Sequence, residues 1–131
     1  MVVIDASVWV SMLNADDSFH ARAENIFESL AANSETICIP AIAFTEVAGA
    51  IRRTTKDDNV ASGAVYYMKG AVQEVMADFE KLEPIATDMA IKYSIKGMDA
   101  YYLAVAELTK SKLHTFDQQQ EEAFEAIRRR K

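Results

Sequence analysis

The chain has 131 residues, half of them hydrophobic, with 20 acidic and 14 basic residues and a formal net charge of −6. This composition suits one domain with a buried core and excludes a disordered tail. No apolar run approaches the roughly 18 residues of a membrane span, and the first residues lack the basic region of a signal peptide. The single cysteine, Cys38, excludes an internal disulfide, and with only two histidines it argues against a zinc site. We therefore expect a single cytoplasmic domain over residues 1–131.

The hydrophobic pattern predicts strands and helices that alternate along the whole chain. In chain order we expect a strand over 1–5, helices over 7–13 and 19–33, a strand over 36–39, helices over 40–53 and 57–79, a strand over 82–86, helices over 87–96 and 99–110, a strand over 112–116 and a helix over 118–130. Pro40 fits a first helical turn, and Gly97 fits a helix end. Alternating strands and helices predict an α/β fold with a parallel sheet covered on both faces.

Four acidic residues fall where such a sheet would gather them. Asp5 closes the first strand, Glu46 lies in an almost wholly apolar helix, Asp99 opens a helix, and Asp117 follows the last strand. Ligands of open parallel sheets bind outside the carboxyl ends of the strands. We call these four residues the acidic quartet and expect them to converge on one pocket.

Each acid also has an ordinary structural interpretation. Asp5, or Ser7 two residues later, could cap the following helix. Asp99 could likewise be a cap, and Asp117 with Gln120 matches a capping box. Glu46 could be a solvated surface residue.

The order and spacing of these motifs resemble the PIN-domain ribonuclease family. The resemblance rests on Asp5 with Ser7, on Glu46, on Asp99 within GMDAYYLAVA and on Thr115 two residues before Asp117. The size and layout are similar to VapC-like toxins of toxin–antitoxin pairs. The resemblance implies a three-layer α/β/α fold with a small central parallel sheet of about four strands. It also implies an endoribonuclease that depends on Mg²⁺ or Mn²⁺.

Carried over position by position, the acidic quartet matches the family's catalytic and metal-holding acids, and Ser7 and Thr115 match its accompanying hydroxyls. Carboxylate oxygens suit hard ions such as Mg²⁺ or Mn²⁺, and such an ion can activate a water for attack on a phosphate. The chain departs from the family where an aliphatic segment often follows the last acid, because residues 118–120 are all glutamine.

The same resemblance implies partners. They are an RNA substrate, a cognate antitoxin protein and a second copy of the chain, for which Tyr66, Tyr67 and Met68 offer an apolar patch. An acidic protein is a poor general binder of nucleic acid. RNA would therefore need local cations, and Arg52, Arg53 and Lys56 are the candidates.

Two other classes of protein fit part of this pattern. A phosphatase of the haloacid dehalogenase type or a receiver domain also places acids at strand ends. However, DASVW lacks a second acid two residues after Asp5, the segment LEPIA carries no acid at its end, and no lysine follows the last strand. A PIN-like module that binds metal, RNA or protein without cleaving RNA stays open as the alternative.

Overall fold

The computed structural model describes residues 1–130. Its elements are β1 (Val2–Ile4), α1 (Ala6–Leu13), α2 (His20–Ala32), β2 (Ile37–Pro40), α3 (Ile42–Thr55), α4 (Asp58–Ala71), β3 (Glu74–Met76), α5 (Phe79–Tyr93), α6 (Gly97–Thr109), β4 (Lys112–His114) and α7 (Gln118–Arg129). No helix in this range is long and apolar enough to cross a membrane.

The four strands form one parallel sheet in the order β3-β2-β1-β4. Every residue of the two central strands is buried, as expected for strands covered on both faces. Val3 is paired with Cys38 on one side and with Leu113 on the other. The carboxyl ends of β1, β2 and β4 therefore lie at the same edge of the sheet.

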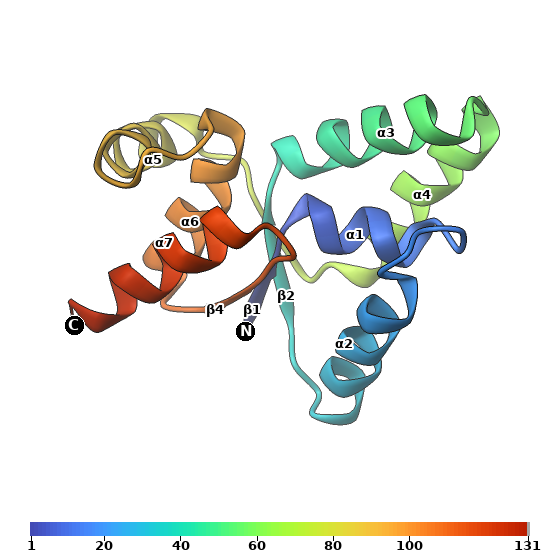
Figure 1. Ribbon diagram of the computed structural model, residues 1–131, viewed down its shortest axis with the longest axis horizontal. Helices are drawn as coiled ribbons and strands as arrows, with labels where there is room; N and C mark the ends of the chain where they lie inside the picture. The colour runs from blue at the N-terminus through green and yellow to red at the C-terminus, as the bar shows by residue number, and fades with distance from the viewer. Residues whose placement is uncertain (131) are drawn as a thin grey trace.

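Helices form a layer on each side of the sheet, so the three-layer α/β/α architecture is confirmed (Figure 1). Helices α1 to α4 lie on one side, and α5, α6 and α7 lie on the other. Trp9 of α1 is fully buried, and its indole N–H donates a hydrogen bond to the carbonyl oxygen of Ile4 at 3.1 Å. This bond fixes the start of α1 against the end of β1.

The strand predicted over residues 82–86 is wrong, because this segment lies inside α5. Leu82, Ala86 and Met89 are buried, and their spacing of four and three residues is that of a helix. Asp78 caps the helix by accepting the N–H of Lys81 at 3.1 Å. Pro84 lies in the helix interior, where proline removes a backbone hydrogen bond, so the local sequence does not look helical.

The true third strand is Glu74–Met76, within the region predicted as the end of a long helix. That helix, expected over residues 57–79, stops at Ala71 as α4. The strand is a short edge strand, and Val75 is 42% exposed, so it lacks the buried apolar run by which strands are found. The adjacent side chain of Gln73 accepts the N–H of Ile37 at 2.8 Å, which ties the start of this segment to β2.

Three smaller expectations also change. Pro40 is the last residue of β2 and not part of a first helical turn, because α3 begins at Ile42. Gly97 begins α6, while α5 ends before Ser94, which adopts a left-handed conformation with φ of 54°. Met68 is fully buried in the core. The expected apolar patch therefore reduces to Tyr66 and Tyr67, which are 83% and 43% exposed.

Candidate active site

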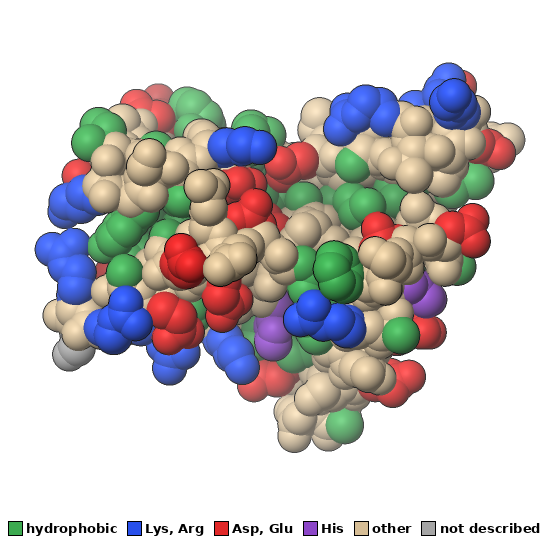
Figure 2. Space-filling view, viewed as in Figure 1, with side chains coloured by type: hydrophobic (Ala, Val, Ile, Leu, Met, Phe, Trp, Pro, Cys, Tyr) green, Lys and Arg blue, Asp and Glu red, His purple; other side chains and the backbone are tan. Residues whose placement is uncertain are grey.

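The four acids of the quartet line one cleft of about 370 Å³, together with Ser7 and Lys96. Figure 2 shows acidic side chains gathered in the recess between the two helical layers. Asp5 follows β1, Glu46 lies in α3 after β2, Asp99 lies in the first turn of α6, and Asp117 precedes α7. The parallel sheet thus brings together residues from four separate parts of the sequence.

Asp5 is the most buried acid of the quartet, with 3% of its surface exposed. Its Oδ2 accepts three hydrogen bonds, from Ser7 Oγ at 2.6 Å, from Thr115 Oγ1 at 3.0 Å and from the Ser7 N–H at 3.2 Å. Its Oδ1 is buried and has no hydrogen-bond partner. A buried carboxylate oxygen without a partner is costly, and a bound cation would offset that cost.

Ser7 and Thr115 hold two loops together around Asp5. Ser7 Oγ accepts the N–H of Phe116 at 3.0 Å, and Thr115 Oγ1 accepts the N–H of Asp117 at 3.0 Å. The hydroxyls therefore join Asp5 and the first turn of α1 to the β4–α7 loop. They also fix the direction in which Asp5 Oδ1 points.

Helix capping accounts for part of the quartet only. Asp5 and Asp117 are N-caps of α1 and α7 as well as cleft residues, and Asp117 Oδ1 accepts the N–H of Gln120 at 2.9 Å. Asp99 is not a cap, since it is the third residue of α6 and the N-cap is Lys96. Glu46 is half-buried, and its Oε1 accepts a hydrogen bond from the Tyr102 hydroxyl at 2.7 Å. Helix capping and surface solvation therefore do not explain why Asp99 and Glu46 lie in the cleft.

Burial and the neighbouring acids raise the pKa values of two acids of the cleft, Asp99 and Glu46. The pKa of Asp99 is raised from 3.8 to about 6, first by burial and then by the charges of Asp5, Asp117 and Glu46, while Lys96 lowers it slightly. The pKa of Glu46 is also raised, chiefly by burial and further by Asp5, against the hydrogen bond from Tyr102. The cleft is therefore a concentration of negative charge with only one lysine in its lining.

Two residues that support the quartet were not identified from the sequence. Tyr102 is fully buried, and its hydroxyl donates a hydrogen bond to Glu46. Gln120 is also fully buried. Its Nε2 donates to the carbonyl oxygen of Asp99 at 3.1 Å, and its Oε1 lies 3.2 Å from Thr115 Oγ1, sharing the hydroxyl proton with the shorter bond to Asp5. The one local signal for Tyr102 is its place three residues after Asp99 on the same helix, which puts both on neighbouring faces.

The candidate RNA contacts Arg52, Arg53 and Lys56 do not line the cleft. They lie at the end of α3, six to ten residues beyond Glu46, which is about 9–15 Å along the helix axis at ~1.5 Å per residue. Arg52 Nε pairs with Asp58 Oδ1 at 2.6 Å. These three cations therefore lie away from the acids of the cleft, and one of them, Arg52, is already in an ion pair.

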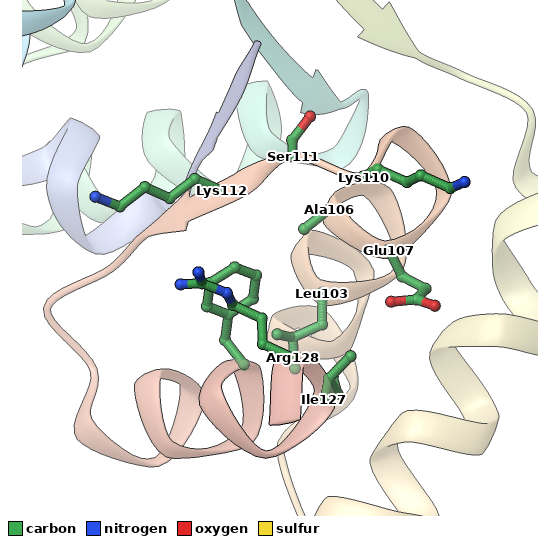
Figure 3. Close-up of a pocket in the computed structure, with 9 residues that line it drawn as sticks. Leu103, Ala106, Glu107, Lys110, Ser111, Lys112, Ile127 and Arg128 are labelled. Atoms are coloured by element: carbon green, nitrogen blue, oxygen red, sulfur yellow. The ribbon is translucent and has the colours of Figure 1, made fainter. Parts of the chain in front are cut away.

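A second cavity, of about 430 Å³, lies between α6, β4 and α7 (Figure 3). Leu103, Ile127 and Arg128 are among its lining residues, and no member of the acidic quartet is. It adjoins Lys112, at the start of β4, whereas the cleft lies beyond the end of that strand. The carboxylates and this cavity are thus separate features.

The donor set of the cleft fits a hard divalent ion. Within residues 1–130, no three His, Cys, Asp or Glu side chains stand close enough to hold one ion directly as they are placed. Mg²⁺ is commonly bound by one or two carboxylates and keeps several waters, so it does not need three direct protein ligands. The unpartnered Oδ1 of Asp5 supplies one such position.

Comparison with known proteins identifies the family. The model of the PIN domain matches residues 2–125, so the chain belongs to the PIN domain family. Two solved structures share its fold. The first is Mycobacterium tuberculosis VapC20, a Sarcin-Ricin loop cleaving toxin, with 19% sequence identity, a TM-score of 0.78, and coverage of 94% of this chain and 95% of that one. The second is PAE2754 from Pyrobaculum aerophilum, with 18% identity, a TM-score of 0.69, and coverage of 98% and 93%. Among curated proteins, no sequence matches the chain.

Proposed function

We propose that this protein is an endoribonuclease that depends on Mg²⁺ or Mn²⁺ and acts as the toxin of a toxin–antitoxin pair. The observation that carries the proposal is the convergence of four acids on one cleft, with the buried Oδ1 of Asp5 unpartnered. Membership of the PIN domain family supports it. The shared fold with VapC20, a Sarcin-Ricin loop cleaving toxin, supports the biological role.

In this proposal one or two carboxylates of the acidic quartet would hold the ion directly and the others would hold it through its waters, and the bound ion would supply an activated water and offset negative charge on the phosphate. The protein's own residues prepare the site. Ser7 and Thr115 hold Asp5 through its Oδ2 and leave Oδ1 for the ion, and the Tyr102 hydroxyl fixes Glu46. Lys96 is the cation nearest the quartet and would bind a phosphate oxygen of the RNA. Arg52, Arg53 and Lys56 would contact nucleotides of the RNA that lie farther from the cleft.

The proposal is tested by an RNA cleavage assay with matched capping variants. Asp117→Asn and Asp78→Asn both replace an N-cap aspartate by asparagine, which retains capping ability, but only Asp117 lies in the cleft. We expect Asp117→Asn to abolish cleavage in Mn²⁺ and Asp78→Asn to retain it, and we expect excess EDTA to stop the wild type. Full cleavage in EDTA, or by Asp117→Asn, would refute the proposed chemistry. Binding of RNA and Mn²⁺ without any cleavage would favour the non-catalytic alternative.

The toxin role implies a protein partner. We propose that an antitoxin segment places a basic side chain in the cleft, where a cation partly replaces the metal among the acids. Neutralising that side chain should abolish inhibition of the nuclease. Inhibition that survives the neutralisation would contradict this mode of binding. A short neighbouring gene for a DNA-binding protein would support the pairing.

A further inference from the structure

Two aromatic rings and an arginine form a cluster where the start of α2 meets the β4–α7 loop, with Phe19 and Arg22 exposed and Phe116 half-buried. Phe19 precedes α2, Arg22 lies in its first turn, and Phe116 lies between β4 and α7. The two rings are 5.4 Å apart between centroids. The guanidinium carbon of Arg22 lies 5.3 Å from the Phe19 centroid and 4.8 Å from that of Phe116. We call these three residues the Phe–Arg cluster.

The cluster is joined to the candidate active site through the backbone of Phe116. This residue stands between Thr115, which bonds to Asp5, and Asp117 of the quartet. Its N–H donates to Ser7 Oγ at 3.0 Å. The backbone of Phe116 is therefore fixed between two residues of the candidate active site. An RNA strand that leaves the cleft past Asp117 would reach the cluster along the β4–α7 loop.

Arg22 is free to accept an anion. It is the one basic residue among the first fifty, which contain seven acids. Its side chain is exposed, and within residues 1–130 the structure gives it ring contacts but no ion pair. A guanidinium that stacks its face on aromatic rings keeps its N–H groups available at the edge, where they match a phosphate.

A second arginine in the chain also stacks on an aromatic ring, but it is paired with a carboxylate. Arg128 lies over the Phe124 ring at 5.5 Å, and its Nη1 also pairs with Glu125 Oε1 at 3.6 Å. It lies far from the quartet, beside the cavity of Figure 3. Arg22 differs in having no carboxylate partner in the described chain and in contacting the ring of Phe116, the residue before Asp117.

We propose that the Phe–Arg cluster is a binding subsite for one nucleotide of single-stranded RNA, flanking the phosphodiester bond that is cleaved. Arg22 binds a phosphate, and the Phe19 ring, 44% exposed, stacks on an unpaired base. Proteins recognise single-stranded RNA by this combination of aromatic stacking and cationic contact. A base inside a duplex is already stacked on its neighbours and does not offer its face. The inference rests on the proposed ribonuclease function and adds where and in what form the substrate binds.

The test measures steady-state cleavage of a short single-stranded RNA in Mn²⁺ by the wild type, Arg22→Gln, Phe19→Leu and the control Arg128→Gln. We expect Arg22→Gln to raise KM about five- to twentyfold, as for a lost charge-assisted contact, with kcat within about twofold. Binding should be measured with the Asp117→Asn protein, with and without Arg22→Gln. The slope of log affinity against log salt should fall by about 0.7 for one lost phosphate contact. Phe19→Leu should raise KM at least about fivefold, and Arg128→Gln should match the wild type.

Each result supports or excludes a specific role for the Phe–Arg cluster. If the wild type cleaves RNA but Arg22→Gln leaves KM and the salt slope unchanged, the subsite is wrong while the proposed function stands. A lower melting temperature with lower kcat and unchanged KM would assign the cluster a structural role and overturn the inference. Unchanged RNA kinetics with weaker inhibition by a Glu-rich peptide would assign it to a protein partner and also overturn it. If the wild type neither binds nor cleaves RNA in Mn²⁺, the proposed function fails and the subsite fails with it.

Discussion

Replacing Asp99 by asparagine should stabilise the metal-free protein at neutral pH. The pKa of Asp99 is raised from 3.8 to about 6 by burial and by the other acids of the cleft. Above pH 6 the folded protein must hold this carboxylate ionised among like charges, whereas the unfolded chain does so without cost. Asparagine removes the charge while it keeps nearly the same shape. A gain in stability from this loss of charge would be unusual, because most substitutions lower the free energy of unfolding.

The size of the effect follows from the pKa. The difference between 3.8 and about 6 corresponds to at most about 3 kcal/mol of unfolding free energy, and solvent in the open cleft screens part of it. Asp99 lies in the first turn of α6, so the variant also loses a favourable interaction with the helix dipole of about 0.3–1 kcal/mol. A net gain of about 1–2 kcal/mol remains, which is about 3–8 °C in melting temperature for a domain of this length.

The direction in which stability changes with pH tests this explanation more directly than the size of the effect does. Between pH 3.8 and about 6 the folded wild type binds more protons at Asp99 than the unfolded chain does, so its stability falls as pH rises through this window. The advantage of Asp99→Asn should therefore open between pH 4 and 6 and stay constant above. Glu80→Gln is the matched control, because Glu80 is an exposed acid in the first turn of α5, outside the cleft. A melting temperature for Asp99→Asn that is lower than wild type at pH 7.5, or a gain that is equal at pH 4 and 7.5, would refute the shared acidic site.

Four further outcomes are expected. Mg²⁺ should raise the melting temperature of the wild type more than that of Asp99→Asn, since only a folded site that binds the ion gains by mass action; equal shifts would contradict a role for Asp99 in binding. Tyr102→Phe should lower cleavage with a melting temperature change of a few degrees at most, because it frees Glu46; unchanged kinetics would remove Tyr102 from the site. Gln120→Leu should lower stability by about 1–3 kcal/mol in urea unfolding, because it removes two buried side-chain hydrogen bonds, to the Asp99 carbonyl and to Thr115; a neutral result would show that these bonds do not stabilise the fold. The protein should form a dimer through exposed Tyr66 and Tyr67, and a monomer by light scattering at tens of micromolar would count against it.

The fold was predictable where the pattern of apolar residues along the sequence is clear. Residues 2–4 and 37–40 are uninterrupted apolar or β-branched runs, and both became central strands. The third strand was missed because its exposed edge position removes that signal. The segment 82–86 was misassigned because Pro84 and a short apolar run resemble a strand locally, while the helical period appears only when Met89 is included.

The acids of the cleft were predictable because the carboxyl ends of parallel strands meet at one edge. Their supporting bonds were not, because they join residues far apart in the chain. Tyr102 and Glu46 are separated by 56 positions, and Thr115 and Asp5 by 110. The capping box expected at Asp117 exists only in part. The N–H of Gln120 bonds to Asp117, but its side chain turns inward to Thr115 and Asp99.

These long-range bonds assign α6 a central position in the site. The helix carries Asp99, and its Tyr102 hydroxyl reaches α3 on the opposite layer through Glu46. Its first turn is held from the α7 side by the Gln120 side chain at the Asp99 carbonyl. A shift of α6 would therefore move Asp99 directly and Glu46 through the Tyr102 bond, while Asp5 stays fixed by Ser7 and Thr115. Substitutions under α6 should thus change the spacing of the acids even where all four are retained, so an intact quartet in the sequence does not by itself guarantee an intact site.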